Sequence, residues 1–371
     1  MIPLFKPQYD YLETNAVETV LKSCWTGLGL QVELFEKEFA RYIGTRYAVA
    51  VNSGTAALSL AIKCLVEPGS SIITTPISFV STVSAIIENG CNPIFADVDP
   101  HTMNLDPNSI PTYCLRNASA ILPVHYAGRP CDMAGITALA KRYDLAVIED
   151  AAHACGASYK GLKAGNLGDA GCFSFHAVKN LSCGDGGMIT TNNKKVYERA
   201  RRLRWCGIDR STWDREGSGW EYEIPEMGHK CHMNNITASI GLVQLAKLDA
   251  ANLRRHEIAK RYAQGFFNDH YAIAPAVKHP VWDDDIYQSS WHLYAIQTEN
   301  RDALYAHLKK NGITAGVHYK PIYDFEAYRN HKVSCPEADT RWKNLLSLPM
   351  YPDMTEQEQD KVIKHVKDFT T

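Results

Sequence analysis

Between Tyr47 and Thr191 the sequence alternates short apolar runs with amphipathic stretches, which restricts the chain to few folds. Several runs are continuous Val, Ile, Leu and Ala, which is typical of strands in a sheet covered on both faces. The stretches between them have apolar residues at helical spacing. Such alternation predicts an α/β fold with a mostly parallel sheet. The predicted strands are Tyr47–Val51, Ser71–Thr75, Pro93–Val98, Ala120–Val124, Ala146–Glu149, Gly171–Phe175 and Gly187–Thr190, and the predicted helices are Ala56–Leu65, Phe79–Ile87 and Met133–Tyr143.

A long helix is predicted from near Ile236 to Phe267, and it leads into a second, smaller lobe. The 371 residues exceed what one small core needs, so we predict a large domain over residues 1–245 and a small α+β domain over 246–371. In the small domain Thr355 and Glu358 have the spacing of a capping box. Its predicted elements are strands at Trp291–Gln297 and Gly316–Tyr319 and helices at Arg301–Asn311, with Gly312 as the cap, and Thr355–Phe369.

The bulk charge excludes some classes of partner. The formal net charge is -2 and the pI is near 6.7, so we expect neither nucleic acid nor a membrane as partner. The beginning of the chain has no signal-peptide pattern, and no apolar run is long enough to span a bilayer. Eleven cysteines are scattered without a Cys-x-x-Cys pair, which favours reduced thiols and a cytoplasmic location over disulfides or a zinc module.

Three segments at the ends of predicted strands could carry chemistry. In the first, Ser53-Gly54-Thr55-Ala56 joins a strand to a helix. Backbone N–H groups at a helix N-terminus bind anions, and Gly54 lets a phosphate approach, while Thr55 can add a hydroxyl. The alternative is a plain turn in which Ser53 or Thr55 caps the helix. The segment is neither a P-loop nor a dinucleotide fingerprint.

The second segment places Asp150 at the carboxyl end of an apolar strand, where α/β sheets position ligand groups. A carboxylate there needs a cationic partner, and a protonated pyridine nitrogen would be one. Ala151 and Ala152 leave room for a flat ring, and His153 could hydrogen-bond a ring oxygen. Alternatively, Asp150 caps the next turn and His153 is an ordinary loop histidine.

The third segment places Lys179 just after the strand that ends near Phe175. Partial desolvation would lower the pKa of its amine and make it nucleophilic. A lone lysine after a strand is usually a solvated surface group. Its neighbours favour a site, because a phosphate cradle, a carboxylate and an amine then meet at one edge of a sheet. Ser174 could add a phosphate contact.

These segments together resemble the DegT/StrS family of sugar aminotransferases, which has the aspartate-aminotransferase fold (PLP fold type I). The resemblance extends over nearly the whole chain, and within the family it is strongest to members that make UDP-4-amino-4-deoxy-L-arabinose. It lies in Ser-Gly-Thr-Ala-Ala-Leu (53–58), Glu-Asp-Ala-Ala-His (149–153), Ser-Phe-His-Ala-Val-Lys-Asn (174–180), Gly-Asp-Gly-Gly (184–187), Trp-Thr-Gly (25–27), Phe-Glu-Lys-Glu-Phe (35–39), Pro-Val-His-Tyr-Ala-Gly (123–128) and Leu-Ser-Leu-Pro-Met-Tyr-Pro (346–352).

The resemblance implies a cofactor, pyridoxal 5′-phosphate (PLP), and a role for each residue. Lys179 forms a Schiff base with PLP, Asp150 pairs with the ring nitrogen and His153 contacts the ring oxygen. Phe79 stacks on the ring, although it could instead be a core residue that opens a helix. Gly54, Thr55 and Ser174 bind the phosphate, and no metal is implied.

The resemblance also implies partners: L-glutamate, which becomes 2-oxoglutarate, a nucleotide-linked keto sugar, and a homodimer with shared active sites. The product would be an amino sugar used in the biosynthesis of the cell envelope or of glycans, for example of lipopolysaccharide. The neighbouring subunit usually donates an Asn to the phosphate, and here Lys230 stands in that place, with His232 in place of an Arg. His229, Cys231 and His232 are too crowded along one short segment to suggest a metal site.

Two further points remain open from the sequence. Arg204, His318 and Lys320 are candidate diphosphate contacts, but surface salt bridges would explain them equally well. Family members that dehydrate sugars have His in place of the Schiff-base Lys, so Lys179 favours transamination, although His176 lies close by. A PLP-binding regulatory protein without catalysis is the other alternative.

Overall fold

The computed structural model describes residues 1–209, 221–268, 271–272 and 277–370. A seven-stranded sheet forms its centre, in the order β1-β9-β8-β5-β4-β2-β3. Strands β8, β5, β4, β2 and β3 are parallel to one another, and β9 is antiparallel to both β1 and β8. The mostly parallel α/β sheet and all seven predicted strands are therefore confirmed. Their bounds are β1 Tyr47–Val51, β2 Ser71–Thr74, β3 Asn92–Phe95, β4 Ala118–Leu122, β5 Ala146–Asp150, β8 Ala170–Ser174 and β9 Gly187–Thr191.

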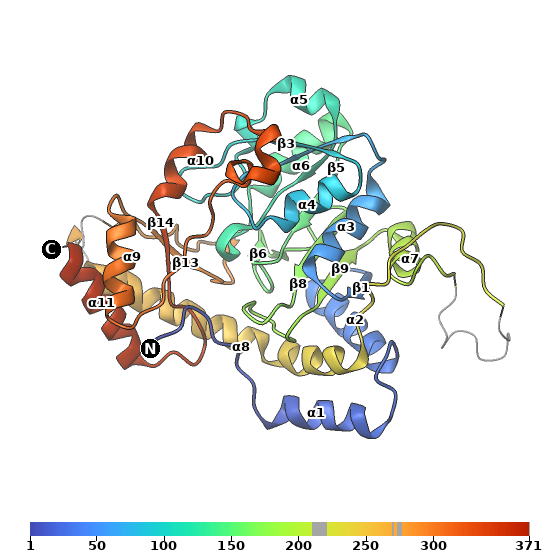
Figure 1. Ribbon diagram of the computed structural model, residues 1–371, viewed down its shortest axis with the longest axis horizontal. Helices are drawn as coiled ribbons and strands as arrows, with labels where there is room; N and C mark the ends of the chain where they lie inside the picture. The colour runs from blue at the N-terminus through green and yellow to red at the C-terminus, as the bar shows by residue number, and fades with distance from the viewer. Residues whose placement is uncertain (210–220, 269–270, 273–276, 371) are drawn as a thin grey trace.

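Helices cover the sheet and extend beyond it (Figure 1). In chain order they are α1 Tyr11–Lys22, α2 Leu30–Ile43, α3 Gly54–Leu65, α4 Ser81–Glu88, α5 Thr112–Asn117, α6 Met133–Tyr143, α7 Lys194–Leu203, α8 Asn235–Phe266, α9 Arg301–Lys310, α10 Pro336–Arg341 and α11 Glu356–Thr370. The remaining strands are β6 Ser158–Tyr159, β7 Leu162–Lys163, β10 Phe267–Asn268, β11 Tyr271–Ala272, β12 Tyr287–Gln288, β13 Tyr294–Gln297 and β14 Leu345–Leu348.

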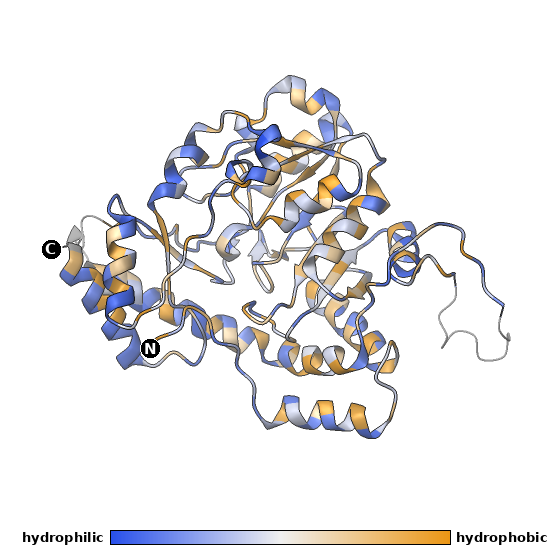
Figure 2. Cartoon of the chain, viewed as in Figure 1, coloured by the Kyte–Doolittle hydropathy of each residue, from blue (hydrophilic) through white to orange (hydrophobic). Residues whose placement is uncertain are grey.

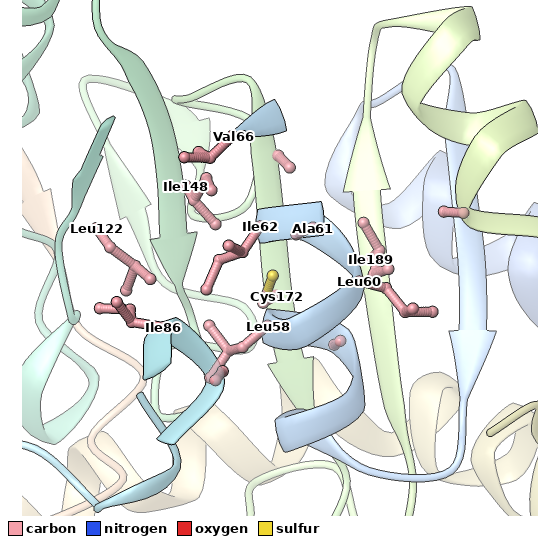
Figure 3. Packing of buried hydrophobic residues seen from close by; sticks show 14 of the residues in the cluster. Leu58, Leu60, Ala61, Ile62, Val66, Ile86, Leu122, Ile148, Cys172 and Ile189 are labelled. Atoms are coloured by element: carbon pink, nitrogen blue, oxygen red, sulfur yellow. The ribbon is translucent and has the colours of Figure 1, made fainter. Parts of the chain in front are cut away.

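Helix α3 packs on the centre of the sheet and begins at the proposed phosphate segment. Its buried side chains Leu58 and Ile62 face Cys172, Ile148 and Leu122 of the strands beneath (Figure 3). Figure 2 shows how hydropathy divides the interior from the surface, with orange on the central strands and blue on the outward helix faces. Burial of each such aliphatic side chain contributes about 1.5–3 kcal/mol to stability, so this core holds α3 against the sheet.

A second core lies beyond the C-terminal half of α8, which runs as one continuous helix along the molecule (Figure 1). Tyr262 and Phe266 of α8 pack there with residues of β13, β14, α9 and α11, and Ile2 from the chain's beginning joins them. The capping box of α11 is confirmed, because Thr355 Oγ1 accepts from the Glu358 N–H at 3.2 Å and Glu358 accepts from the Thr355 N–H at 2.9 Å. The domain boundary at residues 245/246 stays a prediction.

The predicted strand at Gly316–Tyr319 is wrong. β13 pairs with β14 over four residues, and the segment after Gly316 leaves the sheet after a single bridge to Ser347. Gly316 and Ser347 exchange both backbone hydrogen bonds, at 3.1 and 2.7 Å, and no further pair follows along this segment among the described residues. The segment turns toward the carboxyl edge of the large sheet, and this turn brings Tyr319 to the candidate site.

A buried pair fixes the strand that carries Asp150. His125 and Glu149 are both fully buried, with His125 Nε2 at 2.9 Å from Glu149 Oε2. The Cys131 N–H donates to His125 Nδ1 at 3.1 Å, so His125 Nε2 carries a hydrogen and donates it to Glu149. Glu149 also accepts from the N–H groups of Gly165, Leu167 and Gly168, each at 2.8 Å.

Replacing Glu149 with Gln should destabilise the protein by about 2–4 kcal/mol, because two of the buried N–H donors would then face an NH₂ group. Urea unfolding should show a lower midpoint with an unchanged slope. Glu67→Gln, at an exposed position, is the matched control and should leave the midpoint in place. A midpoint for Glu149→Gln equal to that of the control would contradict the structural role.

Candidate active site

The first and third sequence segments meet at the carboxyl edge of the sheet. A Cβ added to Gly54 would lie 2.8 Å from Ser174 Cβ, so only glycine fits between α3 and the end of β8. Ser53 Oγ accepts from the Ala56 N–H at 3.1 Å, so Ser53 caps α3, as the plain-turn alternative predicts. The N–H groups of Gly54 and Thr55 precede the first donor of the α3 ladder and point out of the helix end, where an anion could accept from them.

Asp150 ends β5 and is 4% exposed. Its Oδ2 accepts from Thr82 Oγ1 of α4 at 2.8 Å, and its Oδ1 accepts from the Ala152 N–H at 3.2 Å. Burial raises the pKa of the Asp150 carboxyl, while these hydrogen bonds and the nearby charge of Lys179 oppose the rise. The carboxylate thus both caps the turn and remains available to a cation. The sequence did not predict Thr82 as a site residue.

Lys179 follows β8 in a turn where its N–H donates to His176 O at 2.8 Å. Burial lowers the pKa of its amine to about 8, although the charge of Asp150 acts in the opposite direction. The amine is therefore half deprotonated near pH 8, whereas an ordinary lysine, with a pKa of about 10.4, would be almost fully protonated there. The structure thus places a nucleophilic amine close to the buried carboxylate, and the solvated-surface alternative for Lys179 does not hold.

His153 is buried in the same place and is not an ordinary loop residue. Burial lowers its pKa well below the usual value, so the ring is neutral. Its Nε2 lies 3.1 Å from the Tyr319 hydroxyl, while its Nδ1 is buried without a hydrogen-bond partner in the described residues. An orphaned nitrogen of this kind fits a hydrogen bond to a ligand. Tyr319 was missed as a site residue because it was predicted only as the end of the strand Gly316–Tyr319.

A cavity of about 550 Å³ opens beside this cluster. Its lining includes Phe79, His318, Tyr319, Lys320, Phe325 and Trp342. Phe79 is 57% exposed and precedes α4, which begins at Ser81, so it is not a core residue. Its ring centroid lies 6.5 Å from that of Tyr319, and the exposed ring is free to cover a flat ligand.

Two of the candidate cations are engaged elsewhere. Arg204 is 3% exposed and donates to Glu36 and to the Ala50 carbonyl, so it serves the core and not a diphosphate. Lys230 Nζ lies 4.0 Å from the centre of the Trp205 ring within this single chain. Its role toward a neighbouring subunit stays a prediction. Lys320 Nζ lies 4.9 Å from the Phe325 ring and lines the cavity.

The described residues contain no group of three or more His, Cys, Asp or Glu side chains that could hold a metal ion. Within the same ranges, no helix combines the length and apolarity needed to cross a bilayer.

The residues fit PLP as a bound group. A phosphate fits the start of α3 beside Gly54 and Ser174, a ring cation fits Asp150, and a ring oxygen fits the orphaned nitrogen of His153. The amine of Lys179 could supply the covalent attachment. The fold and this arrangement together define an aminotransferase of the aspartate-aminotransferase-like, PLP fold type I class.

Comparison with known proteins leads to the same class. The DegT/DnrJ/EryC1/StrS aminotransferase family matches residues 7–367, and the chain belongs to this family, whose cofactor is PLP. The spore coat polysaccharide biosynthesis protein SpsC of Bacillus subtilis is 38% identical over 382 residues, covering 99% of this chain and 97% of SpsC.

Two solved structures are similar along the whole chain. The sugar aminotransferase Spr1654 of Streptococcus pneumoniae, described as putative and solved in a PMP-form and a PLP-form, is 29% identical with a TM-score of 0.93 in the PMP-form, covering 100% of this chain and 99% of that one. DesV of S. venezuelae, solved in complex with a ketimine intermediate, is 33% identical with a TM-score of 0.87, covering 96% of this chain and 94% of that one.

Proposed function

We propose that the protein transfers an amino group from L-glutamate to a nucleotide-linked keto sugar, with a 4-keto sugar as the preferred acceptor. The cofactor is PLP. The observation that carries the proposal is the amine of Lys179, desolvated beside the buried carboxylate of Asp150 at the edge of the sheet. The similarity to SpsC and to Spr1654 supports a sugar as the acceptor, and the sequence resemblance supports glutamate as the donor.

When bound, PLP supplies an electron sink for charge that develops at the carbon next to the amino group. Nζ of Lys179 would hold the cofactor covalently and, when free, would take up the proton of the donor carbon. Asp150, oriented by Thr82, would keep a proton on the ring nitrogen. His153 would hold the ring oxygen, and Phe79 would shield the ring from water. In the second half of the reaction Lys179 returns a proton to the carbon of the sugar.

A screen of sugars tests this function. UDP-, dTDP-, GDP- and CDP-linked 4-keto and 3-keto sugars are each supplied with L-glutamate, and product mass and 2-oxoglutarate are measured. We expect 2-oxoglutarate to form beyond one equivalent per site only with a sugar acceptor, and this further 2-oxoglutarate should equal the amino sugar in amount. A product that has lost water without consumption of glutamate would identify a dehydratase. Bound PLP that is indifferent to every donor and acceptor would identify a binding protein.

We also propose a homodimer in the cytoplasm, in which Lys230 completes the phosphate site of the neighbouring subunit. Lys179→Ala and Lys230→Ala subunits, each weak alone, should then regain activity when mixed. One site of the heterodimer contains both native lysines, so activity up to about a quarter of the wild-type value should return after random exchange. Gel filtration with light scattering checks the dimer.

The mixing experiment has a clear opposite outcome. If Lys230 acted within its own subunit, no mixed site would contain both native lysines, and the mixture would be no more active than the sum of its parts. Lys22→Ala, at an exposed position paired with Glu18, serves as the partner for Lys179→Ala in the control mixture. The activity of this control mixture should be no higher than the Lys22→Ala subunits provide by themselves.

A further inference from the structure

His292 lies buried between two loops of the site, although the proposed mechanism gives it no role. It is 1% exposed, and its Nδ1 lies 3.0 Å from Oδ1 of Asn180, the residue next to Lys179. On its other side, its ring centroid is 4.3 Å from that of His153. His292 therefore touches both the loop that carries the amine and the loop that follows Asp150.

The hydrogen bonds determine which atom donates. Asn180 Nδ2 donates to Ser290 O at 2.7 Å and to Asn252 Oδ1 at 2.8 Å. These two bonds fix which atom of the Asn180 carboxamide is the nitrogen. The other atom, Oδ1, must therefore accept, and His292 Nδ1 must donate. The imidazole hydrogen thus lies on Nδ1. Asn180 is held on three sides by groups far away in the sequence, and Lys179 precedes it directly.

Neighbouring contacts clamp the histidine segment in place. Ser290 Oγ donates to His153 O at 2.7 Å, and the Phe5 ring stacks on the His292 ring with centroids 5.5 Å apart and planes 8° apart. Burial lowers the pKa of His292 well below its usual value, so the ring carries no charge that would repel the amine of Lys179. The segment is thus a neutral, rigid support for both loops.

We propose that His292 is a positioning residue: by donating to Asn180 it sets the place of Lys179 Nζ relative to His153 and Asp150. The proposal rests on the amino-transfer function proposed above. The backbone of Lys179 sets the origin of its side chain, so a shift of Asn180 would move the point from which the buried amine reaches the site. A displacement of about 1 Å at a reacting group can cost roughly 10²-fold in rate.

Substitution of the ring tests the proposal in the PLP-loaded enzyme. His292→Phe keeps the contacts with Phe5 and His153 but cannot donate, and we expect kcat to fall about 10- to 100-fold while KM for the sugar stays within about twofold. His292→Asn, whose amide nitrogen reaches the position of Nδ1, should recover most of kcat, whereas His292→Gln should not. His101→Phe, at an exposed position, is the control.

A double-mutant cycle separates positioning from general structural damage. If His292 acts through Asn180, adding His292→Phe to Asn180→Ala should cause no further loss of kcat. Multiplied losses in the double variant, or wild-type kcat in folded His292→Phe, would overturn the proposal. Should His292→Phe not fold, the Asn and Gln variants decide, since equal kcat values for the two would also overturn it. Borohydride labelling of Lys179 is an independent check, because an unlabelled Lys179 in the wild type refutes the proposed function itself.

Discussion

Lys179→Ala should abolish amino transfer, with kcat falling by about 10⁴-fold or more, because one amine both attaches the cofactor and moves the proton. Borohydride reduction of the wild type should leave a pyridoxyl label on the peptide spanning Phe175 to Asn180, and the variant should carry none. The absorbance band near the visible edge that belongs to cofactor attached to Lys179 should be present in the wild type and absent from the variant. The assay measures 2-oxoglutarate formed from glutamate in the presence of the accepted sugar.

Loss of activity in this variant should not come from unfolding. Burial already disfavours the charged amine, so removing it should leave the free energy of unfolding equal or higher. The thermal midpoint therefore serves as the fold check, and exposed Lys22→Ala serves as the activity control. A folded Lys179→Ala enzyme with full turnover would exclude the catalytic assignment.

Asp150→Asn should lower kcat by roughly 10³-fold, since a buried amide cannot stabilise a positive charge on the ring nitrogen. The side-chain shape is kept, and the Thr82 hydroxyl, which also contacts Ser78 at 2.7 Å, can turn to accept from the new amide. The fold should therefore survive, and PLP should still label Lys179. Single-turnover absorbance with glutamate alone should show slow removal of the donor proton.

Thr82→Val provides the graded comparison. It removes one hydrogen bond to the Asp150 carboxylate but leaves the charge, so we expect a loss of only about tenfold. If Asp150→Asn were no slower than Thr82→Val, the charge of Asp150 would not matter to the reaction. The order wild type, Thr82→Val, Asp150→Asn, Lys179→Ala is thus expected in both the half-reaction and full turnover.

Local pattern predicted much of the fold. Every strand of the large sheet was found because it is largely apolar and is followed by a stretch of different periodicity, and in several strands, such as residues 120–122 of β4, the apolar run is continuous. The strand predicted at Gly316–Tyr319 was wrong because its short apolar content is equally compatible with a half-buried loop. The surroundings of a side chain were also beyond the reach of local pattern. Neither the ion pair of Arg204 with Glu36 nor the exposure of Phe79 can be read from the neighbouring residues.

The sequence by itself determined the alternation of strands and helices, the cap of α11 and the residue types that can bind, donate and attack, because these depend on neighbours within a few positions. Only the tertiary structure decided that Thr82 holds Asp150, that Tyr319 reaches His153 and that His292 holds Asn180. Each of these contacts joins residues 68 to 166 positions apart. Such pairs become neighbours only when packing against the two cores closes the long loops between them, and the pKa of Lys179 follows from the burial that this packing creates.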